Sequence, residues 1–275
     1  MCLGDSSPTT CGFSSVVERQ PSKLYVRGSN PLIRLGQKTL YTIHLFSFQG
    51  SMKIFLDTAD TDTIRRYYNT GLIDGVTTNP TLIMKSGKCP TDVYQEIKDI
   101  GIKDISMEVV GDYNEMVKEG QRLYNRFGNV ATIKVPCTED GLMACSYLAK
   151  EGIKVNVTLI FSAAQAILAA KSGATYVSPF VGRLDDQSVA GLEVVRSISE
   201  LYRIHGIKTQ VLSASIRSVQ RVVRSYYNGA QVVTMPPEIF QKMYSHVLTD
   251  KGLEIFDKDW EEVTHKVVTP HPDEE

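Results

Sequence analysis

Val130-Ala131-Thr132-Ile133-Lys134-Val135 is an apolar run, rich in β-branched residues, that a single lysine interrupts. Such a run is typical of a buried strand. Burying an ammonium group is unfavourable, and a buried lysine commonly responds by losing its proton because its pKa falls. A neutral amine is a nucleophile, so Schiff-base chemistry on a carbonyl substrate is the first functional hypothesis. The alternative is a strand at an edge or a barrel end whose lysine extends to water.

From Met52 onwards, strand-like and helix-like segments alternate along the chain. Eight strands are expected, at residues 53–57, 75–78, 105–109, 130–135, 154–158, 175–179, 209–213 and 231–235. Amphipathic helices are expected at residues 61–70, 90–100, 113–127, 139–151, 162–172, 193–205 and 215–228. Thr138, Ser162 and Ser215 are the expected N-caps of three of them. Glycines suited to left-handed C-caps lie near the helix ends, at Gly71, Gly101, Gly128, Gly152, Gly173, Gly206 and Gly229.

Eight strand–helix units in one chain predict a parallel sheet of the α/β class. Eight strands can close into a (β/α)8 TIM barrel. A doubly wound open sheet is the alternative. No GxGxxG motif follows the first strand, which weakens that alternative for a dinucleotide-binding enzyme.

The charges of the chain are balanced, with 30 Lys and Arg against 31 Asp and Glu and a net charge of -1. This balance gives no indication of nucleic acid or an acidic membrane surface as a partner. No apolar run approaches the length of a membrane span, so we expect a soluble, cytoplasmic protein. The five cysteines show no metal-ligand spacing and fit a reducing compartment. Cys89, Cys137 and Cys145 are expected to be free thiols.

Residues 1–51 differ from the rest of the chain because they show no strand or helix periodicity. They lack the features of a signal peptide and of a transit peptide. Residues 13–19 and 28–31 can be back-translated into the D-arm and the T-arm of a transfer RNA gene. We therefore expect residues 1–51 to be a non-domain extension translated from such a gene, with Met52 as the native start and the barrel over residues 52–275. A disordered or family-specific extension is the alternative.

Polar side chains follow the expected strands at their carboxyl ends, where a barrel of this type carries its active site. They are Asp57, Thr77, Thr78, Asn79, Glu108, Lys134, Asn156, Thr158, Ser178, Arg183, Ser215 and Arg217. Several have ordinary structural explanations: Asp57 suits a helix N-cap, and Arg183 suits a surface salt bridge. Ser215 and Arg217 are expected at a helix N-terminus, where a hydroxyl, a guanidinium and backbone N–H groups can bind phosphate.

Five ordered motifs at these positions resemble those of transaldolases. They are Asp57-Thr58-Ala59-Asp60, Gly75-Val76-Thr77-Thr78-Asn79-Pro80, Ile133-Lys134-Val135-Pro136, Asn156-Val157-Thr158-Leu159-Ile160-Phe161-Ser162-Ala163-Ala164-Gln165 and Ser178-Pro179-Phe180-Val181-Gly182-Arg183. The length from Met52 is similar to that of the short-chain transaldolase and fructose-6-phosphate aldolase-like subfamily. The resemblance runs from Met52 to about Val263.

The resemblance implies a class I aldolase barrel without a metal or a cofactor. Lys134 would attack the C2 ketone of a ketose phosphate to form an imine. Asp57 would take the proton of the C4 hydroxyl as the C3–C4 bond breaks. Glu108 and Thr158 would hold the water that transfers protons as the imine forms and is hydrolysed.

The remaining site residues would bind the sugar-phosphate substrate. Asn79 and Asn156 would bind hydroxyls of the dihydroxyacetone unit, with Ser178 nearby, while Arg183, Ser215 and Arg217 would hold a phosphate. The full set of expected substrate-binding residues is Thr78, Asn79, Asn156, Ser178, Phe180, Arg183, Ser215 and Arg217.

Two activities occur on this scaffold, and the resemblance separates them by two residues. Transaldolases carry glutamate and phenylalanine where the aldolases carry glutamine and tyrosine, and this chain has Glu108 and Phe180. We therefore expect a transaldolase of the pentose phosphate pathway. It would move dihydroxyacetone from sedoheptulose 7-phosphate or fructose 6-phosphate to glyceraldehyde 3-phosphate or erythrose 4-phosphate. A fructose-6-phosphate aldolase and a non-catalytic sugar-phosphate-binding barrel are the alternatives.

The tail beyond the eighth strand is more apolar than one barrel helix requires, with Leu253, Phe256 and Trp260 in its last part. It would either fold back over the barrel or pack on another subunit. Because short members of the resembled family form rings, we expect a ring-like homo-oligomer with this C-terminal helix at the interface.

Overall fold

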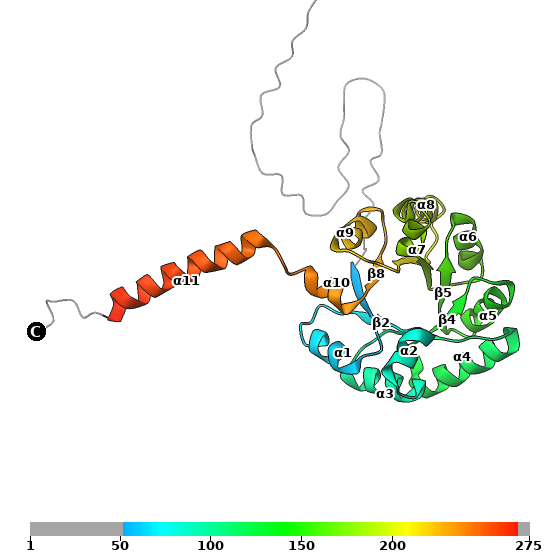
Figure 1. Cartoon of the computed structure of the whole chain (residues 1–275). Coiled ribbons are helices and arrows are strands. Elements are labelled where there is room, and N and C mark those ends of the chain that lie inside the picture. The colour runs from blue at the N-terminus through cyan, green and yellow to red at the C-terminus, as the bar shows by residue number, and fades with distance from the viewer. Residues whose placement is uncertain (1–51, 269–275) are drawn as a thin grey trace, which may run out of the picture. The chain divides into compact units, whose positions relative to one another are not determined.

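The computed structural model describes residues 52–268, with side chains described to residue 264. Its eight parallel strands close in chain order into one barrel (Figure 1). This confirms the predicted (β/α)8 fold and makes the open-sheet alternative wrong. The strands are β1 (Lys53–Asp57), β2 (Gly75–Thr77), β3 (Ile105–Glu108), β4 (Ala131–Pro136), β5 (Lys154–Ile160), β6 (Tyr176–Pro179), β7 (Gln210–Ser213) and β8 (Val232–Met235). The predictions for residues 1–51 lie outside the described residues.

Helices cover the outside of the barrel between successive strands (Figure 1). Those that the sequence predicted are α1 (Thr61–Tyr68), α3 (Pro90–Ile100), α4 (Tyr113–Phe127), α5 (Glu139–Lys150), α6 (Ala163–Lys171), α8 (Gly191–Ile204) and α9 (Val219–Tyr227). A 3-10 turn, η1 (Gly128–Val130), precedes β4, so that strand starts one residue later than expected. The seven glycines expected near helix ends all have a positive φ.

Two short helices on the barrel wall were not predicted, α2 (Pro80–Ser86) and α7 (Val181–Asp186). Each helix has fewer than two full turns, which is too short for a periodic pattern of apolar residues to reveal it. The start of α2 was nevertheless visible in the sequence, because Asn79 caps the helix and Pro80 occupies its first position. The tail forms α10 (Pro237–Lys242) and α11 (Val247–Val268).

The helix N-caps follow the predictions at Thr138 and Ser162, whose side chains accept hydrogen bonds from Gly141 N and Gln165 N. The prediction for Ser215 is wrong. Ser215 has a φ of 58°, in the left-handed region, and the chain continues as a loop before α9 begins. The N-cap of α9 is Ser218, so Ser215 lies three residues before the cap, while Arg217 directly precedes it.

Side chains fill the barrel in layers from its base to its mouth. At the base, Asp104 accepts hydrogen bonds from Thr132, Lys154 and Tyr176. Above this polar layer, the Phe55 ring meets the Tyr176 ring edge to face, with 6.1 Å between their centroids. A closed base and a filled centre leave the carboxyl ends of the strands as the open end of the barrel.

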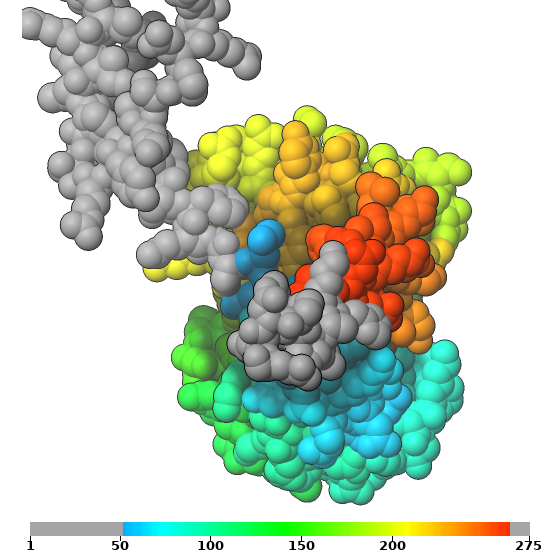
Figure 2. All heavy atoms as spheres, turned by 90° about the vertical axis from the view of Figure 1, so that its left-hand side faces the viewer, coloured from blue at the N-terminus to red at the C-terminus, as the bar shows by residue number. Residues whose placement is uncertain are grey.

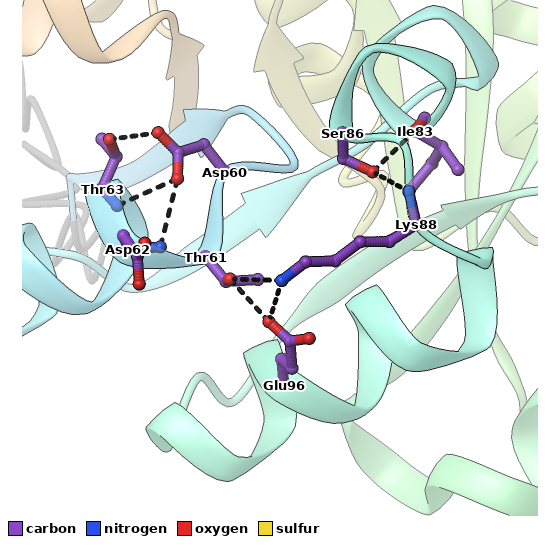
Figure 3. A network of polar contacts seen from close by, with 8 residues as sticks. All are labelled: Asp60, Thr61, Asp62, Thr63, Ile83, Ser86, Lys88 and Glu96. Carbon is purple, nitrogen blue, oxygen red and sulfur yellow. Dashed lines mark hydrogen bonds and ion pairs between the residues drawn. The ribbon is translucent and has the colours of Figure 1, made fainter.

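A polar network ties α2 and the turn after it to the start of α1 (Figure 3). Glu96 on α3 accepts hydrogen bonds from Thr61 Oγ1 and Lys88 Nζ, each at 2.6 Å. Asp60 caps α1 by accepting hydrogen bonds from Asp62 N and Thr63 N. The network fixes the segment that begins at Asn79 beside the carboxyl end of β1.

Helix α11 takes no part in the barrel wall (Figure 1), and its side chains up to residue 264 lie at the surface, in orange to red in Figure 2. Leu253, Phe256, Trp260 and Val263 recur at helical spacing, and each is at least 48% exposed. The alternative in which this helix folds back over its own barrel is therefore not observed. The described part of the chain has no helix long and apolar enough to cross a membrane.

Candidate active site

Lys134 lies inside the barrel on β4, and the residue is only 6% exposed. Its Nζ lies 2.9 Å from Glu108 Oε2 and donates a hydrogen bond of 3.0 Å to the backbone oxygen of Thr78. The alternative of a lysine that extends to water is therefore wrong. The register of the barrel pairs Glu108 with Lys134 across β3 and β4, so the two charges meet because of strand pairing.

Asp57 ends β1 and points into the same cavity as Lys134. It is not a helix N-cap, because Asp60 has that role for α1. Burial raises the pKa of the Asp57 carboxyl, while the charge of Lys134 and a hydrogen bond from Thr77 oppose the rise. Asp57 is thus a carboxyl group whose ionised form is disfavoured, which is common for catalytic acids and bases.

Thr158 lies on β5 next to a β-bulge. Val157 pairs with Val177 and Ile160 with Pro179, so Thr158 and Leu159 together face the single residue Ser178. Leu159 has a φ of 58°, which is unusual for a side chain of this size. The Thr158 hydroxyl is buried and has no hydrogen-bond partner among the described residues. An unpartnered buried hydroxyl that lines a cavity is suited to bind a water molecule or a substrate oxygen.

A chain of polar side chains crosses the interior below the mouth. Ser178 Oγ donates to Asn156 Oδ1 at 2.7 Å, and Asn156 Nδ2 donates to Ser106 Oγ at 3.2 Å. Thr78 Oγ1 donates to the backbone oxygen of Ser106 at 2.9 Å, so its side chain is turned away from the cavity. Asn79 Oδ1 accepts from Leu82 N, which leaves its amide N–H groups available as donors, and the residue lines the cavity. These contacts fix the donors and acceptors that a polyhydroxylated substrate would meet.

Arginines gather on one side of the mouth. Arg183 on α7 lies over the Phe180 ring, with 4.9 Å from its guanidinium carbon to the ring centroid, and has no ion pair within residues 52–264. Arg217 forms a bidentate ion pair with the carboxylate of Asp186. Arg183, Asp186 and Arg217 line a second, more open cavity next to the first.

Gly182 makes room for the loop that carries Ser215 and Arg217. A Cβ atom at residue 182 would lie 2.3 Å from Ser215 O and 2.8 Å from Arg217 Nε. Gly182 N donates to Ser215 O at 2.9 Å. The close approach of these backbones explains why Arg183 lies near Ser215 and Arg217, although a long stretch of sequence separates it from both.

One cavity of about 110 Å³ gathers most of the predicted residues, and this is more space than one water molecule needs. Its lining includes the predicted residues Asp57, Asn79, Lys134, Asn156, Thr158, Ser178, Phe180, Arg183 and Ser215. Glu108 and Thr78 lie behind Lys134, and Arg217 lies in the adjoining cavity. Residues 52–264 contain no cluster of three metal-ligating side chains.

Four residues of the lining were not among the predicted site residues: Thr77, Leu212, Ala214 and Thr234. Thr77 was noticed at a strand end but given no role. Successive side chains of a strand point to opposite faces, so the side chain of Thr77 lies on the opposite face of β2 from that of Val76. Thr234 could have been found by the same rule, because it precedes the end of β8 by one residue. Asp186 was also missed, since an aspartate on a helix too short to be predicted gives no signal.

The comparisons with known proteins agree with this geometry. A family model described as Transaldolase/Fructose-6-phosphate aldolase matches residues 54–267. This chain belongs to that family. A protein named "Probable transaldolase" from Paracoccus denitrificans (strain Pd 1222) is 51% identical over 218 residues, which cover 79% of this chain and all of that protein.

Two further relatives of the transaldolase/fructose-6-phosphate aldolase family carry the same name. One, from Caulobacter vibrioides (strain NA1000 / CB15N), is 52% identical over 210 residues, which cover 76% of this chain and 96% of the relative. The other, from Nitrosopumilus maritimus (strain SCM1), is 50% identical over 214 residues, which cover 77% and 96%. The family predicted from the five motifs is thus confirmed, and the protein is an enzyme of the transaldolase family.

In this member of the family, Asp57→Asn is expected to raise the free energy of unfolding at pH 7. The pKa of Asp57 is raised in the folded chain, so the ionised carboxylate is unfavourable above the unfolded-state pKa of about 3.9. The gain should therefore shrink as the pH falls toward 4. Urea unfolding of the wild type and the variant at both pH values measures it.

Asp60→Asn is the matched control, because the pKa of Asp60 is lowered by its hydrogen bond from Thr63. That variant should lose stability at pH 7 rather than gain it. A loss of stability in Asp57→Asn at pH 7 would contradict the burial of an unfavourable charge at this position.

Proposed function

We propose that the protein is a transaldolase that carries a dihydroxyacetone unit from a ketose phosphate to an aldose phosphate through an imine on Lys134. The observation that carries the proposal is the position of the Lys134 amine, held between Glu108 and the Thr78 carbonyl at a cavity that also contains Asp57. A cytoplasmic role in the pentose phosphate pathway, with sedoheptulose 7-phosphate or fructose 6-phosphate as donor, is part of the proposal.

Imine formation begins with the ion pair. Glu108 takes a proton from Lys134, and the nitrogen lone pair attacks the C2 ketone of the donor to give a carbinolamine. The Thr78 carbonyl still accepts one N–H hydrogen and keeps the nitrogen in place. Glu108 returns the proton to the leaving hydroxyl, so that water and a protonated imine form. The unpartnered Thr158 hydroxyl would bind this water.

Bond cleavage uses the second carboxyl group. Asp57 takes the proton of the C4 hydroxyl, the C3–C4 bond breaks, and its electron pair moves into the protonated imine to give an enamine. An aldose phosphate leaves, and the three-carbon unit stays on Lys134. The acceptor aldose phosphate then enters, the same steps run in reverse, and water hydrolyses the imine. The raised pKa of Asp57 suits a group that must both accept and return a proton near neutral pH.

Substrate binding follows from the rest of the lining. Asn79, Asn156 and Ser178 present donors and acceptors to the hydroxyls of the three-carbon unit. Arg183 and Arg217, with the Ser215 hydroxyl, would bind the phosphate at the more open end of the site. A phosphate held there would keep the sugar chain extended toward Lys134 and align C2 with the amine.

Transfer of the three-carbon unit to an acceptor is favoured over its release, because the site lacks a tyrosine hydroxyl near the enamine. The aldolase branch of the resemblance has glutamine and tyrosine where this chain has Glu108 and Phe180. Phe180 has no hydroxyl to protonate the enamine, so the three-carbon unit would wait for an acceptor. Fructose-6-phosphate aldolase activity is the second candidate. A barrel that only binds sugar phosphates is disfavoured because Lys134 and Asp57 are both present and share one cavity.

Turnover of fructose 6-phosphate should depend on erythrose 4-phosphate. With the acceptor present, we expect steady formation of sedoheptulose 7-phosphate and glyceraldehyde 3-phosphate. Without it, at most one equivalent of glyceraldehyde 3-phosphate per subunit should form, because the enamine stays on Lys134. Coupled enzymatic assays of both products measure this, with Lys134→Met as the inactive control. Rapid release of free dihydroxyacetone without an acceptor would favour the aldolase instead.

We also propose that the chain forms a homo-oligomer through α11. The apolar stripe of Leu253, Phe256, Trp260 and Val263 is exposed in the single chain, and a second copy of the chain is the partner that the family resemblance suggests.

The assembly can be tested by light scattering on the purified protein. The measured mass should be a multiple of the chain mass of 30.6 kDa. Phe256→Asp with Trp260→Asp should reduce it to the monomer, whereas Lys258→Asp, on the same helix but outside the stripe, should not. A wild-type mass equal to that of one chain would contradict the proposal.

A further inference from the structure

Two buried threonines, one on each of the strands that flank β1, form a hydrogen-bonded chain with Asp57. Thr77 on β2 lies directly beside Asp57 in the barrel register, and Thr77 Oγ1 donates to Asp57 Oδ1 at 2.8 Å. Thr234 on β8, the other neighbour of β1, lies 2.6 Å from Thr77 Oγ1 through its own Oγ1. Thr77 and Thr234 are 2% and 3% exposed. The three side chains form a continuous hydrogen-bonded chain at the cavity wall.

Counting hydrogens fixes the direction of this chain. Each hydroxyl has one hydrogen to donate, and an ionised carboxylate can only accept. When Asp57 is ionised, Thr77 must donate to Asp57 and Thr234 must donate to Thr77. When Asp57 is protonated, the direction can reverse, so that Asp57 donates to Thr77 and Thr77 donates to Thr234. Both protonation states of Asp57 therefore keep a hydrogen-bonded partner.

We propose that Thr77 and Thr234 are positioning residues that act as a reversible hydroxyl relay, holding the Asp57 carboxyl group in place as it accepts and returns its proton. The inference rests on the proposed function, because it needs Asp57 to change its protonation state during the reaction. Two charged groups share the surroundings of Asp57, Lys134 on β4 and Glu108 on β3. A backbone N–H or a cation in place of Thr77 would stabilise the ionised state alone.

The base of the barrel offers a comparison on the same scaffold. Thr132 Oγ1 donates to Asp104 Oδ1 at 2.7 Å, a contact much like that of Thr77 with Asp57. Asp104, however, also accepts from Lys154, and Thr132 and Asp104 do not line the cavity. Thr132→Val therefore removes a threonine–aspartate hydrogen bond without touching the proposed relay.

The pH dependence of kcat tests the relay. Thr77→Val removes the donor that opposes the raised pKa of Asp57, so the acidic limb of the profile should move up by about half a unit to one unit. We expect kcat at neutral pH to fall about 10-fold, the size expected for a hydrogen bond to a charged group. KM should change by less than about twofold, because uniform substrate binding is unaffected. Thr77→Ser should restore the profile, and Thr132→Val should leave it unchanged.

The double variant separates a relay from two independent contacts. Thr234→Val should shift the acidic limb in the same direction but less, since it weakens Thr77 as a donor without removing it. Thr77→Val combined with Thr234→Val should match Thr77→Val alone, because Thr234 reaches Asp57 only through Thr77. Circular dichroism and urea unfolding of each variant ensure that only folded protein is compared.

Several results would overturn the relay. They are an unchanged acidic limb in folded Thr77→Val, failure of Thr77→Ser to restore it, or additive losses in the double variant, which would mean that Thr234 acts on the substrate itself. Failure of the proposed function looks different. The wild-type protein would then show no acceptor-dependent turnover at any pH, and no profile would exist to compare.

Discussion

The contact between Lys134 and Glu108 is the constraint on which the interior of the mouth depends. A buried ammonium is tolerated only when a partner compensates its charge, and here the carboxylate lies 2.9 Å away on the neighbouring strand. A buried ion pair of this kind adds little stability compared with apolar residues of similar volume. Its presence in the middle of a barrel is better explained by the proposed chemistry, because in that mechanism it places a proton acceptor beside an amine that must lose a proton to react.

The two carboxyl groups of the mouth have different surroundings, which suits the different tasks proposed for them. Glu108 faces the ammonium of Lys134 directly, whereas Asp57 is bound by Thr77 and its pKa is raised by burial. Environments that distinguish two nearby acids commonly assign them separate proton-transfer roles. The backbone contributes as well: Leu159 and Ser215 both adopt a positive φ next to cavity-lining side chains. Such conformations persist where the surrounding structure holds them, and they are frequent at functional sites.

The sequence predicted the barrel because strand length, apolar runs and helix caps agree from Met52 onwards, and closed strand order follows from eight units in series. It predicted Lys134 because a charged residue inside an apolar strand is exceptional, and Asp57 because it ends a strand where a barrel of this type carries its active site. It could not predict that Glu108 would contact Lys134, since strand register is a property of the assembled sheet. Asp186 was missed because it lies on the short helix α7, which was not predicted. The start of α9 was wrongly predicted at Ser215 because a loop precedes this helix. No role was predicted for Thr77 or Thr234, because threonine is an ordinary strand residue and only their mutual contact makes them unusual.

The central claim is that Lys134 forms an imine with the ketose donor. Borohydride reduction of the full-length protein with fructose 6-phosphate, followed by peptide mass spectrometry, tests it most directly. We predict a three-carbon dihydroxyacetone adduct, reduced and irreversible, on the peptide that contains Lys134, and no adduct in Lys134→Met. An unmodified Lys134, or an adduct on another lysine in the active wild-type protein, would contradict it.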